Sequence, residues 1–173
     1  MIIQFCGLSG SGKTTLAGNV KQLLQQKNIN VEIIDGDEYR KILCSDLGFS
    51  KEDRNQNIRR LAFVAGKLAQ YNVVPIICAI NPYNDVREEI SAAYEEVKTV
   101  FIDCDLDVLI SRDTKGLYKK AMLPEGHPAK TTNLTGINDP FEIPIHAHLV
   151  IHSDKESIEE STEKLVDFIL ENI

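Results

Sequence analysis

Residues 7–14 read GLSGSGKT, and this stretch decides the fold of the chain. It satisfies the pattern GxxxxGK[ST] and stands between an apolar run at residues 2–6 and a stretch with helical spacing. Its glycines let backbone N–H groups turn toward phosphate oxygens, and the N-terminus of the following helix adds positive potential. An ordinary glycine-rich turn gives no packing reason for a Lys followed by a Thr. The sequence therefore predicts a P-loop that cradles the phosphates of a nucleotide.

The end of this loop carries specific chemistry. Lys13 can reach the β- and γ-phosphates of a nucleoside triphosphate, and the Thr14 hydroxyl can ligate Mg²⁺. We therefore expect ATP as the phosphate donor and Mg²⁺ as the cofactor. The predicted nucleotide-binding residues are Gly7, Ser9, Gly10, Ser11, Gly12, Lys13, Thr14, Thr15 and Arg112.

Five short apolar runs follow one another along the chain, and stretches with helical spacing separate most of them. Because these runs are apolar on both faces, they indicate an α/β fold, a parallel sheet with helices on both sides. Ligands of such folds bind at the carboxyl ends of the strands. No linker or repeat divides the chain, so we expect one domain over residues 1–173. The predicted strands are residues 2–6, 31–34, 73–80, 100–104 and 148–152.

Composition excludes several classes of function. The chain has 173 residues, of which 43% are hydrophobic and 26% charged, with a formal net charge of -7. This acidic balance disfavours broad binding to nucleic acid or to a membrane surface. The first apolar run is too short for a signal peptide, and no later run approaches the length of a membrane span. We therefore expect a cytoplasmic location and small-molecule partners, namely ATP and an acceptor.

Cysteine and histidine residues are interpreted as structural. The cysteines are isolated from one another and form no CxxC pair, so we expect buried thiols. His146, His148 and His152 alternate along one stretch, which predicts one polar face of a half-buried strand rather than a metal cluster. The cysteines are Cys6, Cys44, Cys78 and Cys104.

Asp35-Gly36-Asp37 follows the second apolar run, so both carboxylates are expected at the carboxyl end of a strand. One could hold a Mg²⁺-bound water while the other accepts a proton from an attacking hydroxyl. The alternative is an Asp-Gly turn that caps a helix starting near Glu38.

Helical spacing places two further helices. One begins after Ser50, a candidate N-cap with Asp53 three residues on, and turns Arg54 toward its apolar face with Asn57 on the edge. An inward Arg needs an anionic partner, so Arg54 is either a structural ion pair or a ligand clamp in a cleft. The other helix is expected at residues 155–171, with a buried stripe of Ile158, Leu165, Phe168 and Ile169.

Residues 114–144 form a long basic segment with little periodicity, which is typical of a functional lid or of a solvated loop. Arg112 and Lys115 stand at its start and could neutralise charge that develops on a γ-phosphate. Asn81 follows the third apolar run and lines an acceptor pocket or forms a plain turn.

Five motifs together resemble the adenylylsulfate kinase family over nearly the whole chain. The resemblance implies a P-loop kinase fold with strand order 2-3-1-4-5 and Mg²⁺-ATP as donor. It also implies transfer of the γ-phosphate to the ribose 3′-hydroxyl of a nucleotide conjugate, with adenylylsulfate as the family default. The motifs are GLSGSGKTT from Gly7, DGDEYR from Asp35, DLGFSKEDRNQNIRR from Asp46, RDTKGLYKKA from Arg112 and LTGINDPFE from Leu134.

The same resemblance assigns roles to individual residues. It makes Asp37 the general base and gives Asp35 the Mg²⁺-water role, so Thr14 and Asp35 form the implied metal site. Phe49 would stack on the acceptor base, and a homodimer is a candidate assembly. The implied catalytic residues are Lys13, Asp35, Asp37 and Lys115; the implied acceptor-binding residues are Asp37, Arg40, Phe49, Arg54, Asn57, Ile80, Asn81, Lys115, Gly116, Leu117 and Leu134.

Two positions depart from the family pattern on the acceptor side. Leu134 stands where members usually carry Phe as a second wall around adenine, and Asn81 stands where they usually carry Ser. A side-chain amide cannot accept a phosphoryl group, which excludes a phosphoenzyme at Asn81. Two alternatives stay open: a relative retuned to cytidine diphosphoramidate, a precursor for capsule decoration, and a non-catalytic nucleotide-binding module.

Overall fold

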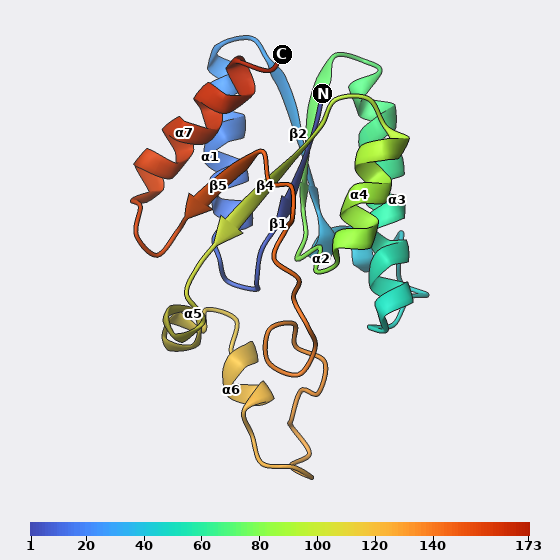
Figure 1. Cartoon of the computed structure of the whole chain (residues 1–173), viewed down its shortest axis with the longest axis vertical. Helices are drawn as coiled ribbons and strands as arrows, with labels where there is room; N and C mark the ends of the chain where they lie inside the picture. Colours follow the sequence, from blue (N-terminus) through green and yellow to red (C-terminus); the bar gives the residue numbers. More distant parts are fainter.

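All residues from 1 to 173 are described in the computed structural model, and its centre is a five-stranded parallel sheet in the order β2-β3-β1-β4-β5. This order and the predicted α/β class are confirmed (Figure 1). The strands are β1 Ile2–Cys6, β2 Asn30–Asp35, β3 Val73–Cys78, β4 Val97–Asp103 and β5 Leu149–His152. The helices are α1 Lys13–Gln26, α2 Gly36–Arg40, α3 Lys51–Ala69, α4 Asn84–Ala93, α5 Leu106–Arg112, α6 Leu117–Ala121 and α7 Ile158–Leu170.

Helices cover both faces of the sheet, as Figure 1 shows. Side chains of α1 and α7 pack with Ile3 and Phe5 of β1 in one hydrophobic cluster. Side chains of α3 and α4 pack with Ile2 of the same strand in a second cluster. All five residues of β1 are buried, which explains why four of them are apolar instead of alternating with polar ones; the exception is Gln4.

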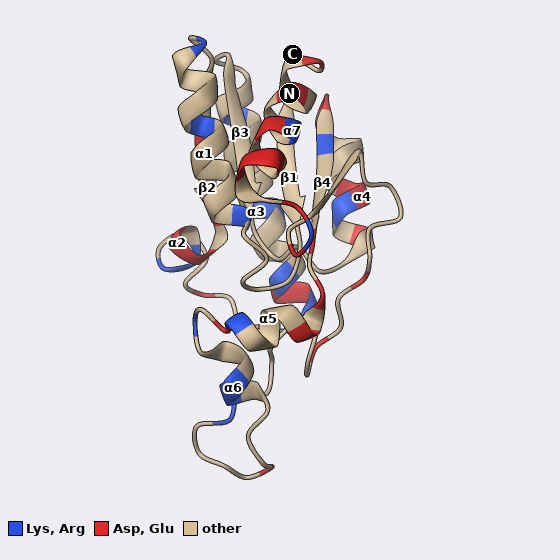
Figure 2. Ribbon diagram, turned by 90° about the vertical axis from the view of Figure 1, so that its left-hand side faces the viewer, with Lys and Arg blue, Asp and Glu red and all other residues tan.

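The central strand β1 pairs with β3 on one side and β4 on the other, so the direction in which strands are added reverses at β1. In open α/β sheets ligands bind at this switch point, beyond the carboxyl ends of the strands. The loop from β1 to α1 therefore stands at the expected position for a ligand site. Segments that carry Lys and Arg lie at α2 and along α5 and α6, around this end of the sheet (Figure 2).

Several predicted boundaries were wrong. The last helix begins at Ile158 rather than at residue 155, because Ser157 and Glu160 form a capping box there. Ile158 is consequently not part of the buried stripe, since it is 53% exposed. His146 and His148 precede β5 rather than lying in it.

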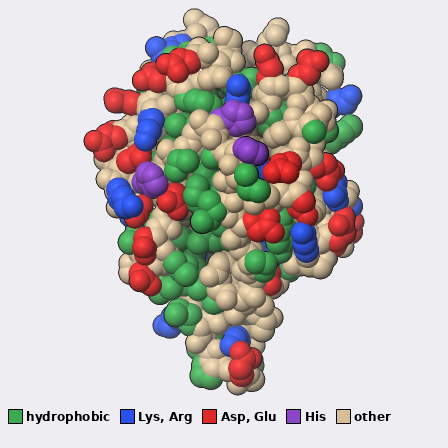
Figure 3. Space-filling model, in the orientation of Figure 1, with side chains coloured by type: hydrophobic (Ala, Val, Ile, Leu, Met, Phe, Trp, Pro, Cys, Tyr) green, Lys and Arg blue, Asp and Glu red, His purple; other side chains and the backbone are tan.

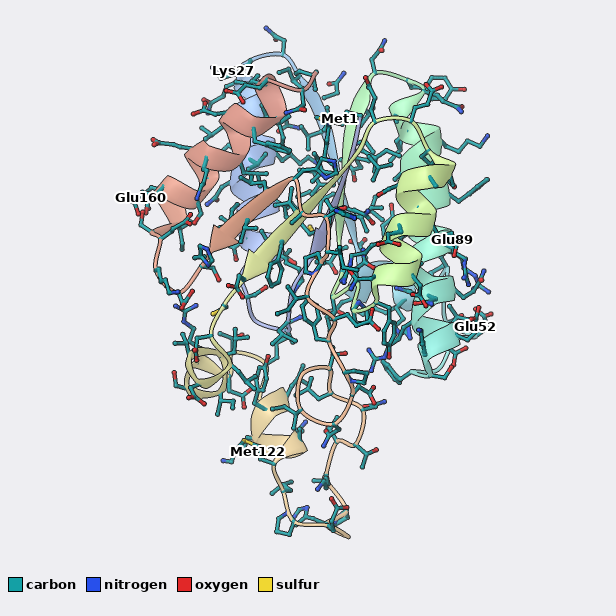
Figure 4. The ribbon with its side chains drawn as sticks, viewed as in Figure 1. Met1, Lys27, Glu52, Glu89, Met122 and Glu160 are labelled. Carbon is teal, nitrogen blue, oxygen red and sulfur yellow. The ribbon has the colours of Figure 1, made fainter.

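The segment 114–144 contains one short helix, α6, which its sequence does not predict. Met122, the residue after α6, lies at the opposite end of the molecule from Met1 (Figure 4). All four cysteines are buried and unpaired, so the prediction of core thiols is confirmed. No helix is both long enough and apolar enough to cross a membrane.

Candidate active site

The P-loop joins the end of β1 to the start of α1 at Lys13. Gly12 caps the helix with φ 94, a left-handed conformation that favours glycine. A Cβ atom on Gly7 would stand 2.5 Å from the Ile102 carbonyl oxygen, so any side chain there would push the loop away from β4. The backbone conformation at Gly12 and the close contact at Gly7 explain why the sequence pattern requires glycine at both positions.

Lys13 is almost fully buried beneath the loop. Its ammonium donates to the carbonyl oxygens of Gly7 at 3.0 Å and Leu8 at 2.7 Å. Burial lowers the pKa of Lys13 from its usual 10.5 to about 8. Both carbonyl partners are uncharged, so the phosphates of a nucleotide would supply the missing negative charge.

We expect the affinity for ATP to be level below pH 8 and to fall above it. The free protein begins to lose the Lys13 proton near pH 8, and bound phosphates would hold that proton. Binding at pH 9 should therefore take up part of a proton, and affinity should fall about tenfold per pH unit above the pKa. Calorimetry in buffers of different ionisation enthalpy measures both quantities.

Lys27→Met is the matched control, since Lys27 is exposed just after the same helix and should leave the pH profile unchanged. An affinity for ATP that stays constant between pH 7 and 9.5 in the unmodified protein would contradict this assignment.

Asp35 performs two tasks at the carboxyl end of β2. Its Oδ1 accepts from the backbone N–H groups of Asp37 at 2.8 Å and Glu38 at 3.3 Å, so it caps α2. Its Oδ2 accepts from the Thr14 hydroxyl at 2.9 Å. The turn interpretation is therefore correct, and the same carboxylate still faces the P-loop.

The oxygen atoms of Thr14 and Asp35 form a suitable donor set for Mg²⁺. They are hard oxygen ligands, and Mg²⁺ typically binds to one or two protein oxygens together with substrate phosphates and water. No group of three or more His, Cys, Asp or Glu side chains forms an independent metal cage. The residues present thus fit a magnesium ion brought with a nucleotide.

Two cavities meet beyond the carboxyl ends of the strands. The P-loop cavity, of about 310 Å³, is lined by P-loop residues together with Asp35 and Lys115. The α3 cavity, of about 100 Å³, is lined by residues of α2, α3 and the loop after β3. Residues that line both cavities are Asp37, Ala79 and Ile80.

Asp37 stands on this shared wall with its side chain 77% exposed. Lys115 donates to its Oδ2 at 2.6 Å across a sequence separation of 78 residues. The structure therefore brings together Asp37 and Lys115, which belong to separate sequence motifs.

The α3 cavity is lined by two guanidinium groups and one carboxylate. The guanidinium groups of Arg40 and Arg54 lie 4.6 and 5.5 Å from the centre of the Phe49 ring. Burial and the neighbouring charge of Arg54 lower the pKa of Arg40. Asn57 completes this wall from α3. A pocket of this kind suits a ligand with both an anionic group and a flat ring.

Arg54 forms the structural ion pair that was one of the two interpretations of its sequence position, and the ligand clamp stays a prediction. Arg54 lines the α3 cavity, and its Nη2 donates at 2.6 Å to Asp139 Oδ2 and to the Asn133 carbonyl. Both partners belong to segment 114–144, so this ion pair holds that segment against α3. The sequence did not identify Asp139, although the residue lies in one of the recognised motifs.

Other predicted site residues lie near the P-loop but not in the α3 cavity. Arg112 donates weakly to the Ser153 carbonyl and lines a hollow with Ser11, Gly12 and Thr15. Leu117 lies beside Ser9 and Gly10, whereas Gly116 lines neither cavity and caps α6.

Leu134 does not form a wall of the α3 cavity. It is 6% exposed and packs with Leu109, Tyr118 and Ala121 in a separate hydrophobic cluster. Tyr118, which the sequence did not single out, anchors this cluster because its hydroxyl donates to the Ser9 carbonyl at 2.8 Å. Leu134 thus makes a core contact within a cluster that supports the P-loop.

The sheet order and the phosphate loop at the end of β1 define the chain as a P-loop nucleotide-binding protein of the kinase type. The sequence model of the family described as adenylylsulphate kinase matches residues 1–152. The chain belongs to this family, whose members are ATP-dependent phosphotransferases with a hydroxyl group as acceptor.

Individual relatives agree with this assignment. The chain is 45% identical to the adenylyl-sulfate kinase of Chloroflexus aurantiacus over 166 residues, which cover 96% of this chain and 87% of that protein. A structure of the Mycobacterium tuberculosis APS kinase CysC in complex with AMPPNP and APS is 35% identical, with a TM-score of 0.89, and the match covers 98% of this chain and 96% of that one.

A third relative is the hexameric APS kinase from Thiobacillus denitrificans, which is 26% identical with a TM-score of 0.70. The match covers 98% of this chain and 28% of that chain. Membership of an enzyme family argues against the non-catalytic module, and these relatives give no support to the capsule alternative.

Proposed function

We propose that the protein transfers the γ-phosphate of ATP to the ribose 3′-hydroxyl of adenylylsulfate. The observation that carries this proposal is the position of Asp37 on the wall that the P-loop cavity and the α3 cavity share. A carboxylate at that point can contact an acceptor hydroxyl on one side while the γ-phosphate approaches from the other.

The reaction follows from the side chains around this wall. Asp37 accepts the proton of the 3′-hydroxyl while the hydroxyl oxygen forms a bond to the γ-phosphorus. The bond from this phosphorus to the β–γ bridging oxygen breaks, and ADP leaves. Lys13 and Lys115 bind the phosphoryl oxygens on which charge develops. Thr14 and Asp35 would hold a Mg²⁺ ion, which neutralises phosphate charge when bound.

The cationic α3 cavity supports an acceptor with a large anionic group. Arg40 and Arg54 would bind the phosphosulfate, and Phe49 would stack on the base. The acceptor would also contact Asn57, Ile80 and Asn81. Residues 114–144 would form a lid that closes over both nucleotides, and this lid includes Gly116 and Leu117. Closure of this lid, a homodimeric assembly and a cytoplasmic location remain predictions.

The direct test is an acceptor-dependent assay with Mg²⁺-ATP. Addition of adenylylsulfate should release ADP and form a 3′-phosphorylated product in equal amounts, as measured by chromatography. The cytidine conjugate serves as the comparison acceptor and should turn over at least tenfold more slowly. ADP release that does not respond to adenylylsulfate would overturn the proposal.

Arg54→Met should raise the KM for adenylylsulfate about 10- to 100-fold, because one charged hydrogen-bonding partner is lost. The KM for ATP should change little, since Arg54 does not line the P-loop cavity. Steady-state kinetics with each substrate varied in turn measures both values.

Arg60→Met is the matched control on the same helix. Arg60 pairs with Asp46, whose side chain is 60% exposed, so its loss should leave both KM values unchanged. If Arg54→Met also leaves the acceptor KM unchanged, Arg54 acts only as the anchor of Asp139.

A further inference from the structure

A third cavity, of about 340 Å³, lies between α4, β4 and the segment that leads into β5; we call it the α4 cavity. Its polar lining includes Asn84, Arg87, Ser91, Thr99, His146 and His148. None of these residues lines the P-loop cavity or the α3 cavity. Figure 3 shows histidine side chains gathered beside a basic side chain on the face where β4 and β5 lie.

Arg87 is a buried cation that makes no salt bridge within the chain. It is 3% exposed, and its Nη atoms donate to the carbonyl oxygens of Asn81 and Glu142, each at 2.5 Å, and to Asn84 Oδ1 at 2.7 Å. These acceptors are all uncharged. Its Nε is buried without a hydrogen-bond partner. Burial of a guanidinium is costly unless it is compensated, and the Phe141 ring, whose centre lies 5.8 Å from the guanidinium carbon, compensates it only in part. An anion in the α4 cavity, which Arg87 lines, would supply the missing negative charge.

His148 adds a second donor. The backbone N–H of Thr99 donates to His148 Nδ1 at 3.1 Å, so Nδ1 carries no hydrogen and the neutral ring carries it on Nε2. Burial, with Lys98 and His146 nearby, lowers the pKa of His148, which favours this neutral form. The ring therefore has Nε2–H available as a donor.

Thr99 adds a third donor. Its hydroxyl accepts from Gln4 Nε2 at 2.9 Å, which leaves the hydroxyl hydrogen free to donate elsewhere. Gln4 also donates to Ser91 Oγ at 3.2 Å, so one buried amide fixes both hydroxyls. Glu88 is the carboxylate that lines the cavity, and it makes no ion pair with Arg87.

From this convergence of donors we propose that the α4 cavity is a second anion-binding site, which takes a small tetrahedral oxyanion such as sulfate or phosphate. Such an ion accepts hydrogen bonds on every oxygen, as the side chains of Arg87, His148 and Thr99 require. The ion can be free or can be the end of a larger metabolite, because the cavity opens to solvent in the structure.

Arg87 also links this cavity to the α3 cavity. Its Nη1 holds the carbonyl of Asn81, a residue that lines the α3 cavity with an unusual φ of 47. An anion beside Arg87 would therefore alter its hydrogen bond to the Asn81 carbonyl oxygen and, through Asn81, the affinity for the acceptor. This link rests on the proposed function, whereas anion binding itself does not.

The test is equilibrium dialysis with radiolabelled sulfate in the presence of saturating Mg²⁺-ADP, which fills the P-loop cavity. Chloride keeps the ionic strength constant, and unlabelled phosphate in a parallel arm tests competition. The unmodified protein should bind one sulfate saturably, at millimolar concentrations, and phosphate should displace it. His148→Ala and Thr99→Val should each weaken binding at least tenfold, with thermal unfolding confirming that both variants are folded.

His152→Ala is the matched control, because His152 pairs with Asp103 and does not line the α4 cavity. It should bind sulfate as the unmodified protein does. No saturable binding at millimolar sulfate, or binding that is unchanged in both His148→Ala and Thr99→Val, overturns the site.

A kinetic arm tests the link to Asn81. The KM for adenylylsulfate in the unmodified protein should change with sulfate concentration, and His148→Ala should reduce this response. If sulfate binds but the KM for the acceptor does not change with sulfate concentration, the proposed link between the α4 cavity and the α3 cavity is wrong. Failure of the kinase proposal would leave the dialysis result intact, so the two outcomes can be told apart.

Discussion

Asp37→Asn should reduce kcat with adenylylsulfate by about 10²- to 10⁴-fold, the usual loss when a general base is removed. Asparagine keeps the shape of the side chain but cannot accept the proton of the attacking hydroxyl. Asp37 is largely exposed and caps no helix, so the variant should fold normally and bind ATP with unchanged affinity. Single-turnover kinetics and calorimetric titration measure the two effects separately.

Glu38→Gln removes a neighbouring carboxylate from the same short helix and is the matched control. It should keep kcat within about twofold, since surface charges away from a site contribute little. If Asp37→Asn retains more than a tenth of the activity, another group accepts the proton and Asp37 has only a positioning role.

Lys13→Met should lower kcat/KM for ATP by about 10²- to 10³-fold, as expected when one preorganised donor to developing phosphate charge is lost. The variant should not be less stable than the unmodified protein. Below pH 8 Lys13 is charged in both the folded and the unfolded states, and burial of that charge costs about 3 kcal/mol, as the fall in pKa from 10.5 to about 8 indicates. Chemical denaturation and steady-state kinetics check these two statements.

Lys21→Met is the matched control on the same helix. Lys21 forms a partly exposed ion pair with Glu32 at 2.8 Å and lies outside the P-loop cavity, so its loss should leave ATP kinetics unchanged. A Lys13→Met protein that loses activity and also unfolds at much lower denaturant concentration would show that Lys13 supports the loop rather than the phosphates.

Local sequence patterns predicted most of the fold and part of the candidate site. The P-loop was readable because its chemistry is contained in eight consecutive residues. The inward direction of Arg54 and Asn57 followed from helical periodicity, and both side chains are buried. Such features depend on residues that are close in the sequence, and the spacing of apolar residues shows them directly.

Contacts between distant segments were not predictable in the same way. Asp139 lies 85 residues from Arg54, and Ser9 lies 109 residues from Tyr118, so no periodicity connects either pair. Leu134 was expected near the acceptor base because of its place in a family motif, and the sequence does not show that α5 and α6 pack against it. The start of α7 was placed too early because the capping box of Ser157 and Glu160 was not recognised in the sequence.

The wall between the P-loop cavity and the α3 cavity also has a stereochemical meaning. Asn81, at the edge of that wall, offers no nucleophilic oxygen and so cannot carry the phosphoryl group, and the proposed mechanism uses the Asp37 carboxylate as a proton acceptor rather than as a nucleophile. With Asp37 in that role, the donor and the acceptor meet in one ternary complex, with the entering and leaving oxygens on opposite sides of the phosphorus. Such a single displacement inverts the configuration at phosphorus, whereas a relay through the protein would retain it.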